Sequence, residues 1–367
     1  MSQKNSTIQS NKETALSEKT AAVVRAHFKA PEDSAVIMDK MLTEDEQLFI
    51  SAAEPDRDYE PREIEELFYG CSQNPEPEPQ DPVSRLYHRG VIDPGEKEGT
   101  YRIGNFWSRL DIFATEEPDL YMTIPEDIRL KTEDAYLKRY EESLWDADPE
   151  KLNAAGGFRP TEDEVLPIED VLTFIDGKDE QAYLADCDCR SLRQACKAPR
   201  DLCITYRTGP YSFVRRGLAK PITKEEAGEI VLRAEKEGLV HTINPGGVCS
   251  CCTDCCYLFR TAEDKGCLGI WPKVSYRIEL DEDACVGCGR CLERCRFGVL
   301  SAADGPEKNV KPHVVLPLFL ALPLLVARVR ADYAHDAFTA YDAAVLAYAT
   351  NRTTYFHCCC LLFRVVE

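Results

Sequence analysis

Cysteines are crowded in this chain, and their clustering constrains its fold more than any other feature. The 367 residues include 18 cysteines. Disulfide scaffolds are usually short secreted chains, whereas residues 1–20 are polar and lack the basic start and apolar segment of a secretory signal. We therefore expect a cytoplasmic, reducing environment in which cysteine thiolates serve as metal ligands.

The composition indicates a globular chain of two or three modest domains with little affinity for polyanions. The formal net charge is -20, and 44% of the residues are hydrophobic. Such a charge repels nucleic acid and anionic membrane surfaces. The apolar run 314–329 is interrupted by Pro317 and Pro323, and it is shorter than the roughly 20 residues that span a bilayer. We expect neither nucleic acid nor membrane as a partner.

The run C-V-G-C-G-R-C-L-E-R-C has the spacing by which a loop wraps a cubane cluster. Two-residue spacers let consecutive sulfurs reach different irons. Gly287 and Gly289 stand where the backbone must approach the inorganic sulfides, so a Cβ would obstruct it. A zinc knuckle is the alternative, but zinc sites favour separated C-x-x-C pairs. The predicted cluster ligands are Cys285, Cys288, Cys291 and Cys295.

This run resembles the bacterial ferredoxin-type 4Fe-4S domain over residues 276–303, and the resemblance implies at least one 4Fe-4S cluster. Arg296 replaces the proline that is usual in that family. Two-cluster ferredoxins have a second run, but residues 304–330 contain no cysteine. Either Cys295 closes the cluster itself or a distant cysteine does. The tail reads as a divergent or frame-shifted replacement, and we interpret its cysteines at 358–360 as unligated.

Ten further cysteines precede this run between residues 187 and 267, and we predict that most of them bind metal. They resemble the cysteine-rich region ahead of ferredoxin domains in uncharacterised 4Fe-4S binding proteins. The choice between iron–sulfur clusters and zinc stays open, because the spacings are standard for neither. Which four form one site also stays open. The predicted ligands are Cys187, Cys189, Cys196 and Cys203 in a first group and Cys249, Cys251, Cys252, Cys255 and Cys256 in a second, and Cys267 follows alone.

Other polar residues near these cysteines are expected to have supporting or structural roles. His241 is interpreted as a surface or core histidine rather than a ligand, and Cys71 as an ordinary thiol. Cations should stabilise negatively charged clusters. Those interleaved with the first group are Arg190, Arg193, Lys197 and Arg200.

The fold class is predicted to be α+β and multi-domain. We expect a flexible tail over 1–40, a helical, winged-helix-like domain over 41–116, and an acidic connecting region over 117–180. A cysteine-rich metal-binding region over 181–275, a ferredoxin-like domain over 276–305 and an atypical tail over 306–367 follow.

Local signals place the elements within these regions. Capping boxes predict helices that begin after Thr43 and Thr223, and further helices are expected from Pro61 and over 82–89 and 167–177. Alternation predicts a strand pair over 101–113, with a turn at 104–105, and single strands over 183–186 and 276–280.

Electron transfer is the function that these patterns favour, either as a ferredoxin-like carrier or as an oxidoreductase subunit with a redox protein partner. An iron–sulfur-sensing transcriptional regulator that uses the winged-helix-like region is the alternative, although acidic residues crowd its helices. A zinc-bound interaction module is a third reading. Nucleotide-binding loops and the H-E-x-x-H motif are absent from the sequence.

Overall fold

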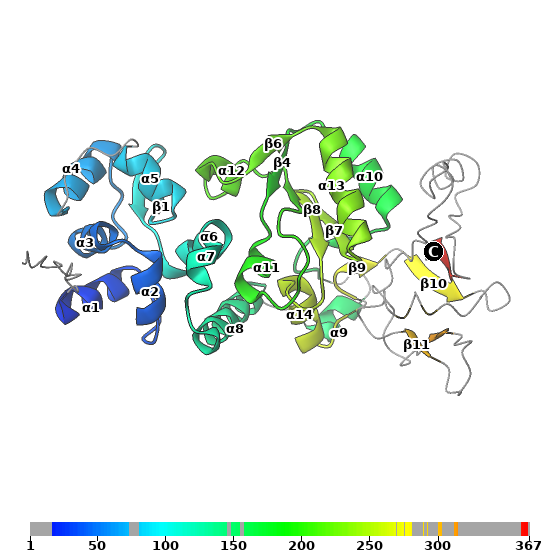
Figure 1. The fold of residues 1–367 in the computed structure, drawn as a ribbon. Helices are drawn as coiled ribbons and strands as arrows, with labels where there is room; N and C mark the ends of the chain where they lie inside the picture. Colours follow the sequence, from blue (N-terminus) through cyan, green and yellow to red (C-terminus); the bar gives the residue numbers. More distant parts are fainter. Residues whose placement is uncertain are drawn as a thin grey trace, which may run out of the picture. The chain divides into compact units, whose positions relative to one another are not determined.

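The computed structural model divides the chain into two compact units, each described here by itself (Figure 1). Unit 1 comprises residues 1–113 and 119–124, and unit 2 comprises residues 114–118 and 125–367. The structure describes residues 17–72, 81–144, 148–154, 158–268, 270–274, 276–280, 289, 292, 300–302, 312–314 and 361–365.

Unit 1 is a helical bundle with one antiparallel hairpin. Its α3 begins at the predicted capping box, in which Thr43 and Glu46 cap each other's backbone N–H groups. The α5 helix ends before Gly90, which has a φ of 74°. The elements are α1 (Glu18–His27), α2 (Ala35–Met41), α3 (Glu44–Ala52), α4 (Pro61–Cys71), α5 (Pro82–His88), β1 (Ile92–Pro94), β2 (Tyr101–Ile103), and the boundary helices α6 (Phe106–Glu116) and α7 (Pro118–Tyr121).

Two expectations for the N-terminal region are wrong. From Ser17 onward the predicted tail is structured, because α1 and α2 bury Val24 and Ile37 completely in the core of unit 1. The predicted strand pair over 101–113 is instead β2 followed by α6. Its second half is helical because Asn105, predicted as a turn residue, caps α6 by accepting from the Trp107 and Ser108 N–H groups.

Unit 2 is built on a seven-stranded sheet with the order β6-β4-β5-β8-β7-β3-β9. The pairings are antiparallel except for β3 with β9. The strands are β3 (Glu164–Val165), β4 (Ala182–Ala185), β5 (Cys203–Thr205), β6 (Lys220–Ile222), β7 (Val240–Asn244), β8 (Gly247–Cys251) and β9 (Lys273–Val274). The helices are α8 (Glu126–Ser143), α9 (Pro149–Asn153), α10 (Ile168–Asp176), α11 (Asp188–Arg193), α12 (Phe213–Arg216), α13 (Lys224–Lys236) and α14 (Tyr257–Asp264).

Two hydrophobic cores pack against this sheet. The first joins α10 and α13 to Ile204 and Val248 of the central strands. The second joins α9 and α14 to Val165 and Val240. Along β8, Val248 belongs to the first core and Cys251 to the second. The sheet therefore has a buried layer on each face.

The predicted acidic connecting region is an integral part of unit 2 beyond residue 125. Its β3 is a strand of the sheet and its α10 packs in the first core. The side chain of Glu133 in α8 is fully buried and forms ion pairs with Arg193 of α11 and Arg260 of α14. The acidic composition suggested a solvated linker, but these carboxylates have arginine partners distant in sequence.

Other predicted elements of unit 2 are confirmed. The helix predicted from Thr223 is α13, with both capping-box hydrogen bonds present. The predicted segments 167–177, 183–186 and 276–280 correspond to α10, β4 and β10 (Tyr276–Leu280). Two small antiparallel sheets pair β10 with β13 (Leu361–Val365) and β11 (Leu300–Ala302) with β12 (Pro312–Val314).

Among the described residues, no helix combines the length and the apolar character that crossing a membrane requires. Residues 315–329 of the apolar run lie outside the described residues.

Replacing Glu133 tests whether the buried carboxylate holds α8 against the cysteine-bearing helices. Glu133→Gln keeps the shape but leaves Arg193 and Arg260 without their buried partner. We expect a loss of about 2 kcal/mol in the free energy of unfolding, below the range for fully buried pairs because both arginines are partly hydrated. Asp134→Asn is the matched control, since the Asp134 side chain is 65% exposed. Equal stabilities of the two variants in anaerobic denaturant titrations would contradict this role.

Candidate metal centre

The cysteines of unit 2 fall into two groups because β8 alternates its side chains between the two faces of the sheet. Cys249 and Cys251 are two residues apart and share one face, whereas the next residue, Cys252, points to the other. The two hydrophobic cores of unit 2 show the same division. Cys249 and Cys251 contact the second core, and Cys252 lies in the first. The turn that follows β8 repeats the division, with Cys255 in the first core and Cys256 in the second.

Six thiols form a continuous group, here called the six-thiol group, on the side of the second core. The antiparallel register pairs Ile204 with Val248, so Cys203 at the start of β5 lies beside Cys249. Each thiol shifts the pKa of its neighbour along the series Cys189, Cys187, Cys203, Cys249, Cys251 and Cys256.

This group has more sulfur donors than the four that one cubane uses. Asp188 adds a carboxylate, because its oxygen lies within 4.8 Å of the Cys187 and Cys189 sulfurs. Cys187 precedes α11 as its N-cap and Cys256 precedes α14 in the same way. The six thiols therefore lie at the ends of β4, β5 and β8 and at the starts of α11 and α14.

The pKa shifts of these residues show how strongly neighbouring groups interact. Hydrogen bonds from Cys189 and Cys203 hold the pKa of Cys187 well below its usual range. Hydrogen bonds from Cys203 and Cys251 lower the pKa of Cys249 to about 6. Burial and the negative charge of Cys187 raise the pKa of Asp188 to about 6. The pKa of Cys189 and that of Cys203 are raised beside Cys187 and Cys249, whose pKa values are lowered. A metal ion is the partner that lets several thiolates coexist in such a group.

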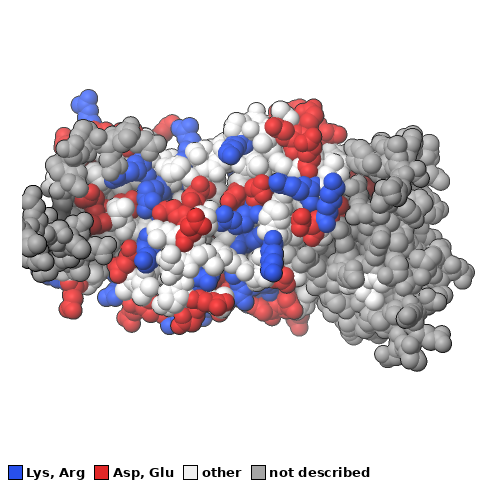
Figure 2. All heavy atoms as spheres, in the orientation of Figure 1, with Lys and Arg blue, Asp and Glu red and all other residues white. Residues whose placement is uncertain are grey.

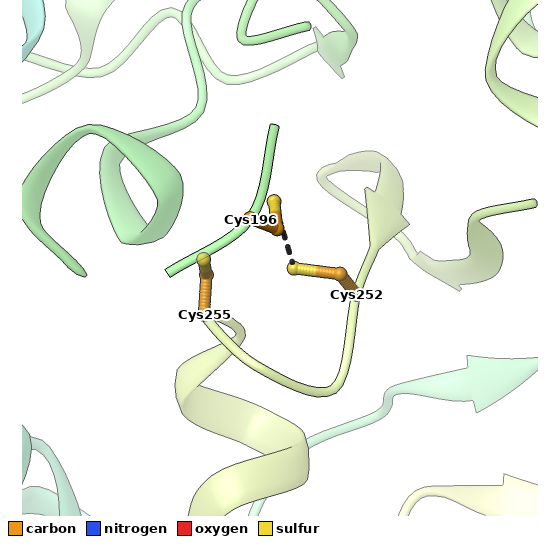
Figure 3. A group of neighbouring side chains, drawn as sticks. All are labelled: Cys196, Cys252 and Cys255. Carbon is orange, nitrogen blue, oxygen red and sulfur yellow. Dashed lines mark hydrogen bonds between the residues drawn. The ribbon is translucent and has the colours of Figure 1, made fainter. Parts of the chain in front are cut away.

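Three thiols form a second, smaller group, here called the three-thiol group. Cys196 follows α11, Cys252 follows β8 and Cys255 precedes α14, and their side chains converge from these three segments (Figure 3). The Cys252 thiol donates to the Cys196 sulfur at 3.5 Å, and all three sulfurs lie within 4.8 Å of one another. Cys252 and Cys255 are buried, whereas Cys196 is partly exposed.

Arg190 is a buried cation beside both groups. It donates through Nη1 to the Pro199 carbonyl at 2.6 Å and through Nη2 to the Ser250 carbonyl at 2.9 Å. Burial alone would lower the pKa of Arg190, but the negative charges of Cys187, Cys252 and Cys196 raise it above its ordinary value. The guanidinium therefore compensates thiolate charge and ties the Cys196 loop to β8, as the sequence predicted for an interleaved cation.

The other predicted cations do not share this position. Arg193 pairs with Glu133, and Arg200 pairs with Asp186 at 3.8 Å. Arg193 thus links α11 to α8, and Arg200 links its loop to Asp186.

His241 is a core residue, as predicted. Its ring is fully buried between Glu235, whose Oε2 is 3.2 Å from Nε2, and Ser250, whose Oγ is 3.4 Å from Nδ1. Cys267 lies buried in the second core, in neither thiol group. Cys71 belongs to unit 1, and burial raises the pKa of its thiol.

The predicted cubane ligands Cys285, Cys288, Cys291 and Cys295 lie outside the described residues, as do Cys358, Cys359 and Cys360. Gly289 within the run is described, and its φ of 73° lies in the left-handed region. The Leu292 amide donates to the Gly289 carbonyl at 2.9 Å. Gly289, which was predicted to let the backbone approach the cluster, thus has a positive φ, the conformation that favours glycine.

Comparison with known proteins identifies this part of the chain. The model of the 4Fe-4S binding domain family matches residues 278–301. The chain binds a 4Fe-4S cluster. The match contains all four cysteines of the run, so the resemblance predicted from their spacing is confirmed. No curated protein and no solved structure matches the chain.

The grouping of the upstream cysteines differs from their order in the sequence. Cys196, from the first sequence group, joins Cys252 and Cys255 from the second. Two residues of the site region were not predicted. Asp188 stands between two cysteines and could have been recognised from the sequence. Glu133 could not, because its arginine partners are distant in sequence.

Gly289→Ala tests the loop geometry of the 4Fe-4S binding domain. An alanine at positive φ is disfavoured by about 1 kcal/mol, so the visible absorption of the cluster should be lost at lower denaturant concentration under anaerobic conditions. Gly70→Ala is the matched control, because a Cβ there meets nothing within 4 Å. Identical midpoints for Gly289→Ala and wild type would contradict the requirement for glycine.

Arg190→Lys tests the role of the bidentate cation. Lysine keeps the charge but cannot donate in a planar fork to both the Pro199 and Ser250 carbonyls. We expect a loss of about 2 kcal/mol in the free energy of unfolding and a lower metal content of unit 2. Arg215→Lys, at an exposed position, should match wild type in both measurements. Unchanged stability and metal content in Arg190→Lys would remove this role.

Proposed function

We propose that this protein transfers single electrons, as a ferredoxin-like carrier or as the electron-transfer subunit of an oxidoreductase. The observation that carries the proposal is the match of residues 278–301 to the 4Fe-4S binding domain. Its four cysteines, at positions 285, 288, 291 and 295, are proposed as the cluster ligands. The cluster supplies the one-electron chemistry, and the polypeptide sets its potential through charge, amide groups and exclusion of water.

The six-thiol group supports a role with more than one redox centre. Its donors are cysteine sulfurs, which are the usual ligands of iron–sulfur clusters, and Cys187, Cys251 and Cys256 are buried while the other three are partly exposed. We propose that four of the six ligate a second cluster.

The chemistry of the surface favours a protein partner over nucleic acid. Figure 2 shows acidic and basic side chains interspersed over one face of the described residues, with no broad basic area on it. Glu63, Glu65 and Glu66 lie on α4 of unit 1, where a DNA-reading helix would need cations. The proposed partner is therefore a redox protein, and the regulator hypothesis stays a prediction without a specific contact in its favour.

The decisive experiment is anaerobic purification with iron and sulfide analysis, followed by redox titration with electron paramagnetic resonance. We expect a reversible one-electron signal at low potential. Cys288→Ala should lose about four irons and the corresponding signal, while Cys71→Ala, the matched thiol control in unit 1, should retain both. A holoprotein that shows no reversible one-electron step would overturn the electron-transfer proposal even if iron is present.

A further inference from the structure

The three-thiol group has a geometry different from that of a cubane site. Three sulfurs around one tetrahedral ion are separated by about 3.8 Å, because each zinc–sulfur bond is about 2.3 Å long. The Cys252 and Cys196 sulfurs are 3.5 Å apart, and all three sulfurs lie within 4.8 Å. A cubane uses four thiolate ligands spread around its iron–sulfide core, a number that this group of three does not supply among the described residues.

The surroundings of this group also match a single ion. Cys252 and Cys255 pack as members of the first hydrophobic core, and Cys196 packs against it. An ion among three sulfurs needs no space beyond the one they enclose, whereas a core of four irons and four sulfides would have to displace these packed side chains.

The local charge balances for one divalent ion. Three thiolates and one divalent cation leave a single negative charge. Arg190, whose side chain is held by the Pro199 and Ser250 carbonyls, supplies one compensating positive charge beside Cys196 and Cys252. A buried site is favoured when its charges are paired in this way.

We propose that Cys196, Cys252 and Cys255 bind one soft divalent ion of the zinc type, separate from the iron–sulfur centres. Thiolate ligands and tetrahedral spacing favour zinc over the hard cations. Among the described histidines, cysteines and carboxylates, none joins these three as a fourth ligand within 4.8 Å. Three protein ligands among the described residues match the donor number of zinc sites that keep a fourth position for water or another exchangeable ligand.

The test measures zinc, iron and labile sulfide on the same anaerobically purified full-length protein. Wild type should contain one equivalent of zinc in addition to its iron. Cys196→Ser should lose that zinc equivalent and keep the iron and sulfide of wild type. Cys196 is the residue of choice because it is partly exposed, so its replacement disturbs the core least. Cys71→Ser, the thiol control, should keep all three elements.

Cobalt substitution gives a second readout that does not depend on purified zinc content. The protein is loaded with Co²⁺ in place of zinc, and its absorption should show tetrahedral bands with charge transfer from three thiolates. Cys196→His should retain one cobalt with charge transfer reduced by one third, because imidazole replaces one thiolate. This variant keeps a ligand at the position, so a loss of folding cannot imitate the expected result.

Two results would overturn the proposal. One is that Cys196→Ser loses iron and sulfide in equal amounts, which would place a cluster at these cysteines. The other is a wild-type protein that takes up neither zinc nor cobalt at this group. Failure of the electron-transfer proposal would look different, because it concerns the redox signal that Cys288→Ala removes and leaves the zinc content unchanged.

Discussion

The alternation of side chains along β8 is the constraint on which both thiol groups of unit 2 depend. An extended strand must send consecutive residues to opposite faces, so Cys251 and Cys252 cannot serve the same site although they are adjacent. Cysteines from other segments complete each group. Cys203 of the paired strand β5 lies on one face, and Cys196 from the loop after α11 lies on the other. Alternation in and directly after β8 thus divides its cysteines between the two faces, and other segments contribute the remaining thiols of each group.

Buried charges hold these segments together where the strands end. Arg190 bonds to the backbone of both the Cys196 loop and β8, and Glu133 of α8 binds arginines of α11 and α14. Removing one partner of a buried ion pair is strongly unfavourable, so these contacts keep the cysteines near one another before any metal binds. The acidic segment that resembles a linker in composition is therefore a support for the metal-binding domain.

The two thiol groups are suited to different ions because their sizes differ. Six sulfurs offer enough donors for a polynuclear core, whereas three sulfurs within 4.8 Å of one another are spaced for one ion. Together with the 4Fe-4S binding domain at residues 278–301, the chain would combine redox centres with a site whose metal does not change oxidation state.

Features that depend on short-range geometry could be predicted from the amino-acid sequence. The two-two-three spacing identified the 4Fe-4S binding domain, and the capping boxes at Thr43 and Thr223 located α3 and α13. The alternation that places Cys251 and Cys252 on opposite faces could also be read from the sequence. The cysteines that join each of them in space could not. Cys196 and Cys252 are 56 residues apart, and Glu133 and Arg260 are 127 apart. Such pairings become visible in the folded chain alone, because strand order and helix packing bring distant residues together through contacts that no local pattern encodes.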